Sequence, residues 1–224
     1  ETIAVDVVFR SDVATTLTMM PEPVAGIAQR TEMDESTLAD MLAEMAKKGL
    51  VFRVAKGEHL LYSAAQFVVG IWEYQVGRLT KALAEDVGRY LPHLLNPLTW
   101  GKAPQMRVVP VEGSIDVRQE ILPHERAAAL LKAQTDFTVM PCICRKERGL
   151  LERACAKPLD TCISFGGAGD YFQRTGAGRP ASREEVLELL RQADRAGLVL
   201  QPSNSRRAGW ICCCCGCCCG VLKN

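Results

Sequence analysis

The clearest hydrophobic pattern in the chain is helical and lies in residues 34–49. Leu38, Met41, Leu42 and Met45 recur at helical spacing, so one face of this segment is apolar. Asp34 is suited to cap the first turn, and Gly49 can end the helix in the left-handed conformation. Shorter helices are predicted at 12–20 and 24–31, on either side of the sequence PEP. Residues 50–63 predict two strands around a turn at Lys56 and Gly57.

The order of three helices and a hairpin resembles the winged-helix family over residues 10–65. The resemblance implies a fold in which the third helix often contacts DNA. Here the outward positions of that helix carry Asp34, Glu35, Asp40 and Glu44. Acidic side chains repel phosphates, and a DNA-binding helix needs lysine or arginine at such positions. We therefore expect a protein contact or a structural role for this region, not binding of nucleic acid.

The rest of the chain alternates helical and strand patterns. Residues 66–91 read as a helix in two pieces, broken near Gly77 or Leu79, and the Pro- and Gly-rich residues 92–105 read as a linker. Strands are expected at 106–111, 137–141, 161–166 and 198–202, with helices at 124–134 and 182–197. Ser182 and Glu185 form a capping box for the last helix. The prediction is an α+β fold with a winged-helix-like domain at 1–91 and a cysteine-rich domain at 106–224.

Composition and charge exclude several classes of protein. With 224 residues, 48% of them hydrophobic, the chain can form a substantial core, and a net charge of +1 gives no reason to expect nucleic acid or an anionic membrane as partner. The apolar run at 60–72 is too short to span a bilayer. The three histidines (His59, His93 and His124) lack metal-ligand spacing, and no serine or carboxylate arrangement suits hydrolysis.

The distribution of the cysteines indicates a specific class of protein. All eleven lie at or beyond position 142. A disulfide-rich secreted protein spreads its cysteines to tie distant segments together, and neighbouring cysteines pair poorly with each other. The distribution therefore predicts metal binding in a reducing cytoplasm.

The first group of cysteines is Cys142, Cys144, Cys155 and Cys162, with the spacing C-x-C-x10-C-x6-C. Four thiolates match the ligand count of an all-cysteine zinc site or of a [4Fe-4S] cluster, and the spacing does not decide between them. The surrounding segment is basic, with Arg145, Lys146, Arg148, Arg153 and Lys157. Positive charge favours thiolates, so we expect this segment to stabilise a metal centre.

The second group is the run Cys212, Cys213, Cys214, Cys215, Cys217, Cys218 and Cys219, interrupted only by Gly216. Cys212, Cys215 and Cys218 fit C-x2-C-x2-C, and Cys214 with Cys217 gives a second C-x2-C in an offset frame. Because neighbouring thiols point in different directions, one segment can serve two metal centres. Seven thiols exceed the four of a single centre, which predicts a paired or polynuclear site or a spare thiol.

Four stretches, VMPCICRKERGLL, CAKPLDTCISFG, GRPASREEVLELLRQADRAGLVLQPSN and GWICCCCGCCCGVL, resemble a family of bacterial and archaeal 4Fe-4S binding, ferredoxin-like proteins. The resemblance covers most of the chain. In that family the last run more often reads I-C-N-C-C-G-C-C-C, so Cys213 stands at the asparagine position and is the residue least expected to be a ligand. The family often continues into a ferredoxin domain, which is not present before Asn224.

The resemblance implies two [4Fe-4S] clusters in an anaerobic electron carrier or a subunit of a redox complex. Cys142, Cys144, Cys155 and Cys162 would hold one cluster. Thiols from Cys212, Cys214, Cys215, Cys217, Cys218 and Cys219 would hold the second or share in the first. Two alternatives stay open: a redox-sensing winged-helix regulator of transcription, and a zinc-stabilised interaction protein. The expected partner is a redox protein.

Overall fold

The computed structural model describes residue 17 and residues 20–95, 105–109, 127–205 and 208–223. The chain divides into two compact units, Glu1–Arg78 and Leu79–Asn224. Both units are mixed α and β, with one antiparallel sheet each, as the α+β prediction requires. None of the helices in the described ranges combines the length and the hydropathy needed to cross a membrane.

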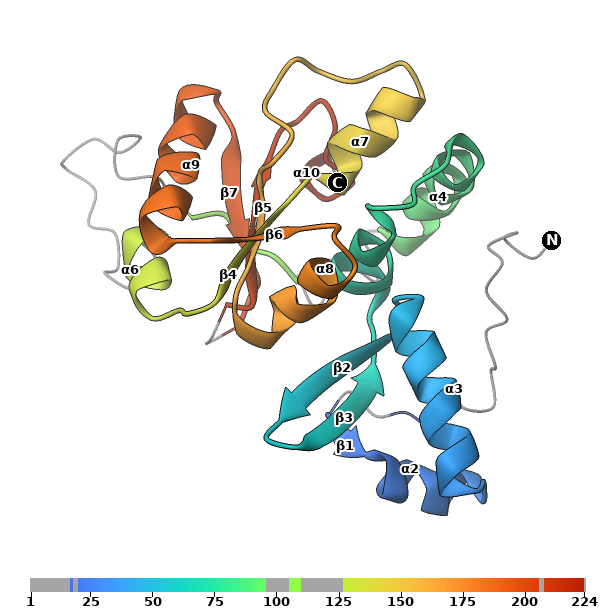
Figure 1. Ribbon diagram of the computed structural model, residues 1–224. Helices are drawn as coiled ribbons and strands as arrows, with labels where there is room; N and C mark the ends of the chain where they lie inside the picture. Colours follow the sequence, from blue (N-terminus) through green and yellow to red (C-terminus); the bar gives the residue numbers. More distant parts are fainter. Residues whose placement is uncertain (1–16, 18–19, 96–104, 110–126, 206–207, 224) are drawn as a thin grey trace. The chain divides into compact units, whose positions relative to one another are not determined.

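In the part of the chain that the structure describes, the N-terminal unit contains two α-helices, a small sheet and two short turns (Figure 1). Strand β1 (Glu22–Pro23) leads into α2 (Val24–Thr31) and α3 (Glu35–Lys47), which are followed by the hairpin β2 (Val51–Lys56) and β3 (His59–Ala64). The Asp34 side chain accepts the N–H of Thr37 at 2.9 Å, and Gly49 has a φ of 71°, so both ends of α3 form as expected. Leu38, Leu42 and Met45 lie in the core of this unit with Ile27 and Tyr62. The predicted helix at 12–20 lies almost wholly outside the described residues.

Residues 66–91 are interrupted between Gln75 and Lys81, as expected from the predicted break near Gly77 or Leu79, but the first piece is not a regular helix. Only α4 (Lys81–Leu94), capped by Thr80, is a regular helix, and it belongs to the second unit. Phe67–Ile71 form an irregular turn, because Val68, Val69 and Gly70 have non-helical backbone angles, and Glu73–Gln75 form a short 3-10 turn. The Glu73 carboxylate accepts the N–H of Gly70 at 2.8 Å and so replaces a helical hydrogen bond. The expected linker at 92–105 overlaps the end of α4, and residues 96–104 lie outside the described ranges.

The second unit is built on a five-stranded antiparallel sheet with the order β6-β4-β5-β8-β7. These strands are β6 (Arg179–Ala181), β4 (Phe137–Met140), β5 (Cys162–Ser164), β8 (Trp210–Cys214) and β7 (Val199–Pro202). Met106 and Val109 form isolated bridges to Ser203 and Leu200. The expected strands at 137–141, 161–166 and 198–202 are therefore present, whereas β6 and β8 were not predicted.

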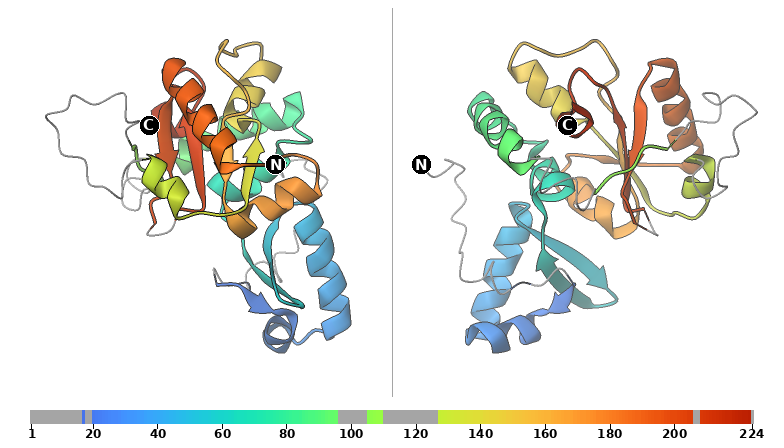
Figure 2. Two further views of the ribbon diagram at one scale, coloured as in Figure 1. Left: turned by 60° about the vertical axis from the view of Figure 1, so that its left-hand side comes forward. Right: turned by 180° about the vertical axis from the view of Figure 1, so that it is seen from behind.

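Helices cover both faces of this sheet (Figures 1 and 2). Helices α6 (Ala127–Lys132) and α9 (Arg183–Arg195) lie on one side, and α7 (Ile143–Leu150), α10 (Gly220–Lys223) and α4 lie on the other. The short segments η5 (Gly166–Gly169) and α8 (Asp170–Arg174) connect β5 to β6.

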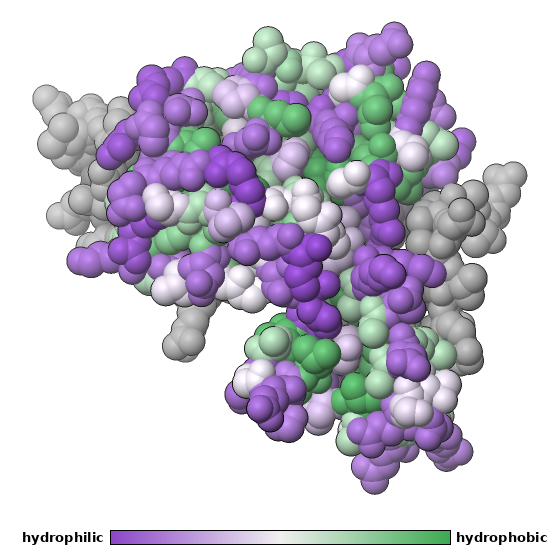
Figure 3. All heavy atoms as spheres, viewed as in Figure 1, coloured by the Kyte–Doolittle hydropathy of each residue, from purple (hydrophilic) through white to green (hydrophobic). Residues whose placement is uncertain are grey.

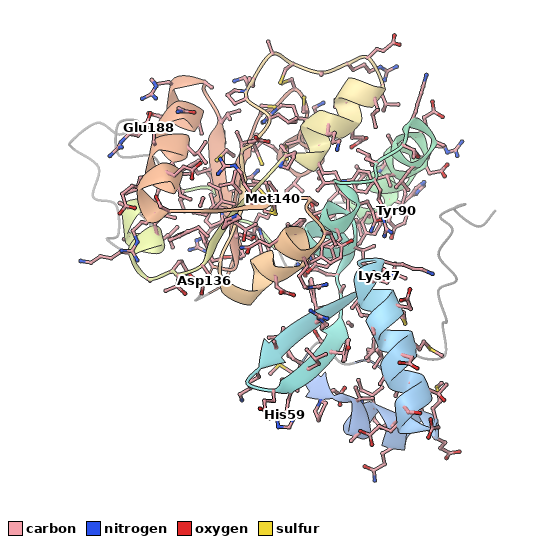
Figure 4. All side chains as sticks on the ribbon, viewed as in Figure 1. Lys47, His59, Tyr90, Asp136, Met140 and Glu188 are labelled. Carbon is pink, nitrogen blue, oxygen red and sulfur yellow. The ribbon has the colours of Figure 1, made fainter. Side chains whose placement is uncertain are left out.

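Helix α9 supplies most of the core on its side of the sheet. Val186, Leu190 and Ala193 pack against Leu200 and Ile211 of the sheet. The Ser182 hydroxyl accepts the N–H of Glu185 at 3.1 Å, as the capping box predicts, and Gly197 ends the helix with a φ of 63°. Hydrophilic side chains predominate on the outer face of this helix (Figure 3), and Glu188, labelled in Figure 4, pairs there with Arg191 and Arg195.

Candidate metal centre

The alternation of side chains along β8 separates the consecutive cysteines. Successive side chains of a strand point to opposite faces of the sheet. Cys212 and Cys214 therefore lie on one face, while Ile211 and Cys213 lie on the other, in the core beneath α9. Cys215, directly after the strand, follows the same alternation and also contacts that core. A run of adjacent thiols is thus divided between two places without any unusual backbone geometry.

Four thiols form what we call the compact cluster: Cys155, Cys215, Cys217 and Cys218. Their sulfur atoms all lie within 4.8 Å of one another, and within the described ranges no other set of three or more metal-binding side chains does so. The Sγ–Sγ distances are 3.6 Å for Cys155–Cys218, 3.8 Å for Cys155–Cys215 and 3.9 Å for Cys217–Cys218. This cluster can hold a metal ion.

A tight turn brings the last three of these thiols together. The N–H groups of Cys218 and Cys219 both donate to the carbonyl of Cys215, at 3.3 and 3.0 Å. Cys155 reaches the turn from the loop that follows α7. Three of the four side chains are buried or half-buried, and Cys217 is exposed.

Six further thiols form what we call the thiol row. Hydrogen bonds link them in the order Cys142, Cys144, Cys219, Cys214, Cys212 and Cys162. Strands β5 and β8 pair Cys162 directly with Cys212, and their sulfur atoms are 3.8 Å apart. Cys142 precedes α7 and Cys144 lies in its first turn. The row is extended, in contrast to the compact cluster.

Arg145 lies in α7 next to Cys144 and is only 3% exposed. Its guanidinium donates to the carbonyl of Cys213 at 3.1 Å, to the Thr161 hydroxyl at 2.8 Å, and to the carbonyl of Pro158. It also approaches the Cys215 sulfur at 3.8 Å and interacts electrostatically with Cys142 and Cys155. One buried cation therefore acts on thiols of both groups.

The electrostatics divide the thiols into those that ionise easily and those that do not. Hydrogen bonds from the thiols of Cys144 and Cys214 lower the pKa of Cys219 to about 3. A hydrogen bond from Cys144 lowers the pKa of Cys142 to about 7. Burial opposes ionisation of Cys215, but hydrogen bonds from Cys217 and Arg145 outweigh it and lower its pKa to about 6. Burial raises the pKa of Cys218 to about 12. Each group thus contains at least one thiol prepared for metal binding.

The grouping of thiols differs from the one expected from spacing. Cys142, Cys144, Cys155 and Cys162 were expected to form one four-thiol centre. In the structure Cys155 joins the cysteines of the C-terminal run, while Cys142, Cys144 and Cys162 lie in the thiol row. The physical reason is the pairing of β5 with β8, which inserts the C-terminal run between the earlier cysteines. The expectation that one segment can serve two groups agrees with the observed arrangement.

Cys213 stands apart from both groups. It is 2% exposed and belongs to the apolar core beneath α9, and its burial raises its pKa. This agrees with the expectation that it is the residue least suited to be a ligand. Among the histidines, His59 and His93 are exposed, with His59 at the turn of the β2–β3 hairpin (Figure 4), and His124 lies outside the described residues.

Two cations of the basic segment around α7 have different surroundings. The Arg145 guanidinium approaches the Cys215 sulfur, whereas the Lys157 ammonium donates to the carbonyls of Ala196 and Gly197 and so caps the end of α9. Gln201 was missed in the sequence. Its side-chain amide, 4% exposed, approaches the Cys219 sulfur at 4.0 Å. The strand register that pairs Gln201 with Cys212 places it there, and no local sequence signal indicates this.

Comparison with known proteins adds no assignment: neither the family models nor the curated proteins nor the solved structures include a match to this chain.

Proposed function

We propose that this chain is an iron–sulfur protein that transfers electrons, as a carrier or as a subunit of a redox complex in a reducing cytoplasm. The observation that carries the proposal is the adjacency of the two thiol groups. Cys214 and Cys215 are consecutive, as are Cys218 and Cys219, yet the members of each pair belong to different groups. Consecutive Cα atoms are about 3.8 Å apart, so centres held by the two groups are direct neighbours.

The thiol row has the ligand chemistry that an iron–sulfur cluster requires. Cysteine thiolates are the usual ligands of such clusters, and four of them hold a [4Fe-4S] cluster. Cys142, Cys144, Cys214 and Cys219 are successive members of the row, and its extended arrangement suits a group larger than one ion. A bound cluster supplies a centre that accepts and releases single electrons.

The protein residues around these thiols control charge and water. Cys214 and Cys219 are buried, and the buried guanidinium of Arg145 opposes the negative charge that thiolates bring into this region. Gln201 offers its amide to Cys219. Hydrogen bonds to cluster sulfurs and exclusion of solvent are the means by which proteins set cluster potentials.

The N-terminal unit is proposed to dock a protein partner through a winged-helix-like arrangement. Asp34, Glu35, Asp40 and Glu44 are all exposed on or beside α3. This acidic face disfavours DNA and therefore the alternative of a transcriptional regulator. It suits contact with a basic surface on a redox protein.

The test is a reductive titration of protein purified without oxygen. We expect visible absorption that bleaches with dithionite and an EPR signal in the reduced state. The double variant Cys144→Ser/Cys214→Ser should lose the bleachable absorption because both substitutions remove ligands from the row. Cys213→Ala is the matched control and should retain it. Protein that is colourless and takes up no electrons would refute the proposed function.

A further inference from the structure

We propose that the compact cluster binds a single metal ion, tetrahedrally coordinated by the thiolates of Cys155, Cys215, Cys217 and Cys218, separate from the iron–sulfur cluster at the thiol row. The inference rests on the proposed function only in assigning that cluster to the row. The single ion in the compact cluster is zinc or iron, because four thiolates in tetrahedral geometry select these metals.

The sulfur positions carry the inference. Four ligand sulfurs placed tetrahedrally, each about 2.3 Å from a zinc ion, are separated from one another by about 3.8 Å. The Sγ–Sγ separations of Cys155–Cys218, Cys155–Cys215 and Cys217–Cys218 in the compact cluster are 3.6, 3.8 and 3.9 Å. A cubane cluster binds its four thiolates through four different iron atoms, so its ligand sulfurs stand farther apart than those around one ion. These three separations match a mononuclear site, and all four sulfurs lie within 4.8 Å of one another.

The backbone around the cluster has the form used by tetrahedral thiolate sites. Cys215 and Cys218 have the C-x2-C spacing found in zinc sites. Backbone N–H groups of Cys218, Cys155 and Lys157 interact with the sulfurs of Cys215, Cys218 and Cys155, respectively. These N–H groups stabilise thiolates and hold three of the four sulfurs in position.

A buried arginine partly compensates the negative charge that four thiolates would bring to the compact cluster. Four thiolates around a divalent ion carry a net charge of −2, and a buried site needs a counter-charge nearby. The Arg145 guanidinium, 3.8 Å from the Cys215 sulfur, supplies it. Because Cys217 is exposed, a metal ion in solution can reach the compact cluster at this thiol.

Metal and acid-labile sulfide are measured in protein purified without oxygen from two variants. In Cys142→Ser/Cys144→Ser, which disrupts the row, we expect about one zinc or iron per chain and no sulfide. In Cys155→Ser/Cys217→Ser we expect that one ion to be lost while sulfide remains at the wild-type level. Sulfide that disappears with the second variant, or several irons with sulfide in the first, would overturn the inference.

A second measurement covers the case in which a double variant does not fold. The wild-type protein is stripped of metal and titrated with Co²⁺. The variant Cys217→Ser, which lacks the exposed thiol of the compact cluster, is titrated in the same way. We expect the intense visible bands of tetrahedral cobalt thiolate, with a thiolate-to-cobalt charge-transfer band weakened by about one quarter in Cys217→Ser. Identical spectra for the two proteins contradict the inference. If no sulfide is found in any variant but the cobalt result holds, the mononuclear site stands and the proposed electron-transfer function fails.

Discussion

Replacement of Arg145 by methionine is expected to destabilise the cysteine-rich unit by about 3–5 kcal/mol, the range found when one partner of a buried ion pair is removed. Methionine keeps the apolar stem of the side chain but removes every donor. The carbonyls of Cys213 and Pro158 and the hydroxyl of Thr161 would then lose a charged hydrogen-bond partner in a buried region. A hydrogen bond to a charged group contributes about 1.5–3 kcal/mol, so the net loss of about two of these three bonds is enough to give an effect of this size.

Hydrogen exchange measures this effect locally. Amides of β5 and β8 should exchange about 150-fold to several thousandfold faster in Arg145→Met than in the wild type, given that about 1.4 kcal/mol corresponds to a factor of ten. Arg153→Met is the matched control, because Arg153 is exposed and follows the same helix. It should change exchange by less than about threefold, the range of surface substitutions. Equal protection in the two variants would mean that Arg145 does not hold α7 to the sheet.

Removal of bound metal is expected to have the largest effect on stability, and the effect should be confined to the second unit. Binding energies of structural metals appear directly as folding energy, at about 10–16 kcal/mol for zinc in small peptides. Ten thiols lie on β5 and β8, at the start of α7, in the loop after α7 and in the turn after Cys215. Without metal, the lowered pKa values of Cys215 and Cys219 favour thiolates in this region, and Arg145 opposes the negative charge at Cys215.

A chelator that strips the protein should therefore abolish slow exchange in residues 151–165 and 210–219. The amides of α3 and β2 serve as an internal control, because their core is formed wholly within the N-terminal unit. Their exchange should not change. Unchanged protection of β8 after complete removal of metal would show that the thiols are held together by the fold alone.

Sequence patterns predicted the elements that have their own periodicity. Helices α3 and α9, the β2–β3 hairpin and strands β4, β5 and β7 all follow from apolar spacing, caps and turn residues. Helix α7 was missed because half of the positions in its sequence, ICRKERGL, are charged and it has no repeated apolar spacing. Strand β8 was missed because WICCC has no alternation of polar and apolar residues.

The sequence predicted which residues form the candidate site, but not how the thiols are divided between two groups. The spacing of cysteines indicated metal binding, and the family resemblance indicated that Cys213 differs from the other thiols of the run. The partition of the thiols depends on the antiparallel pairing of β5 with β8, which joins residues 50 positions apart and has no local signal. If residues 210–214 had been recognised as a strand, the alternation of side chains would have predicted that Cys214 and Cys215 lie on opposite faces of the sheet.

The most direct test of the account is the content of iron, zinc and acid-labile sulfide in the full chain purified without oxygen. The account predicts iron and sulfide in near-equal amounts at the thiol row, together with one further iron or zinc ion at the compact cluster. Zinc without sulfide would contradict an iron–sulfur protein and leave a zinc-stabilised interaction protein in its place.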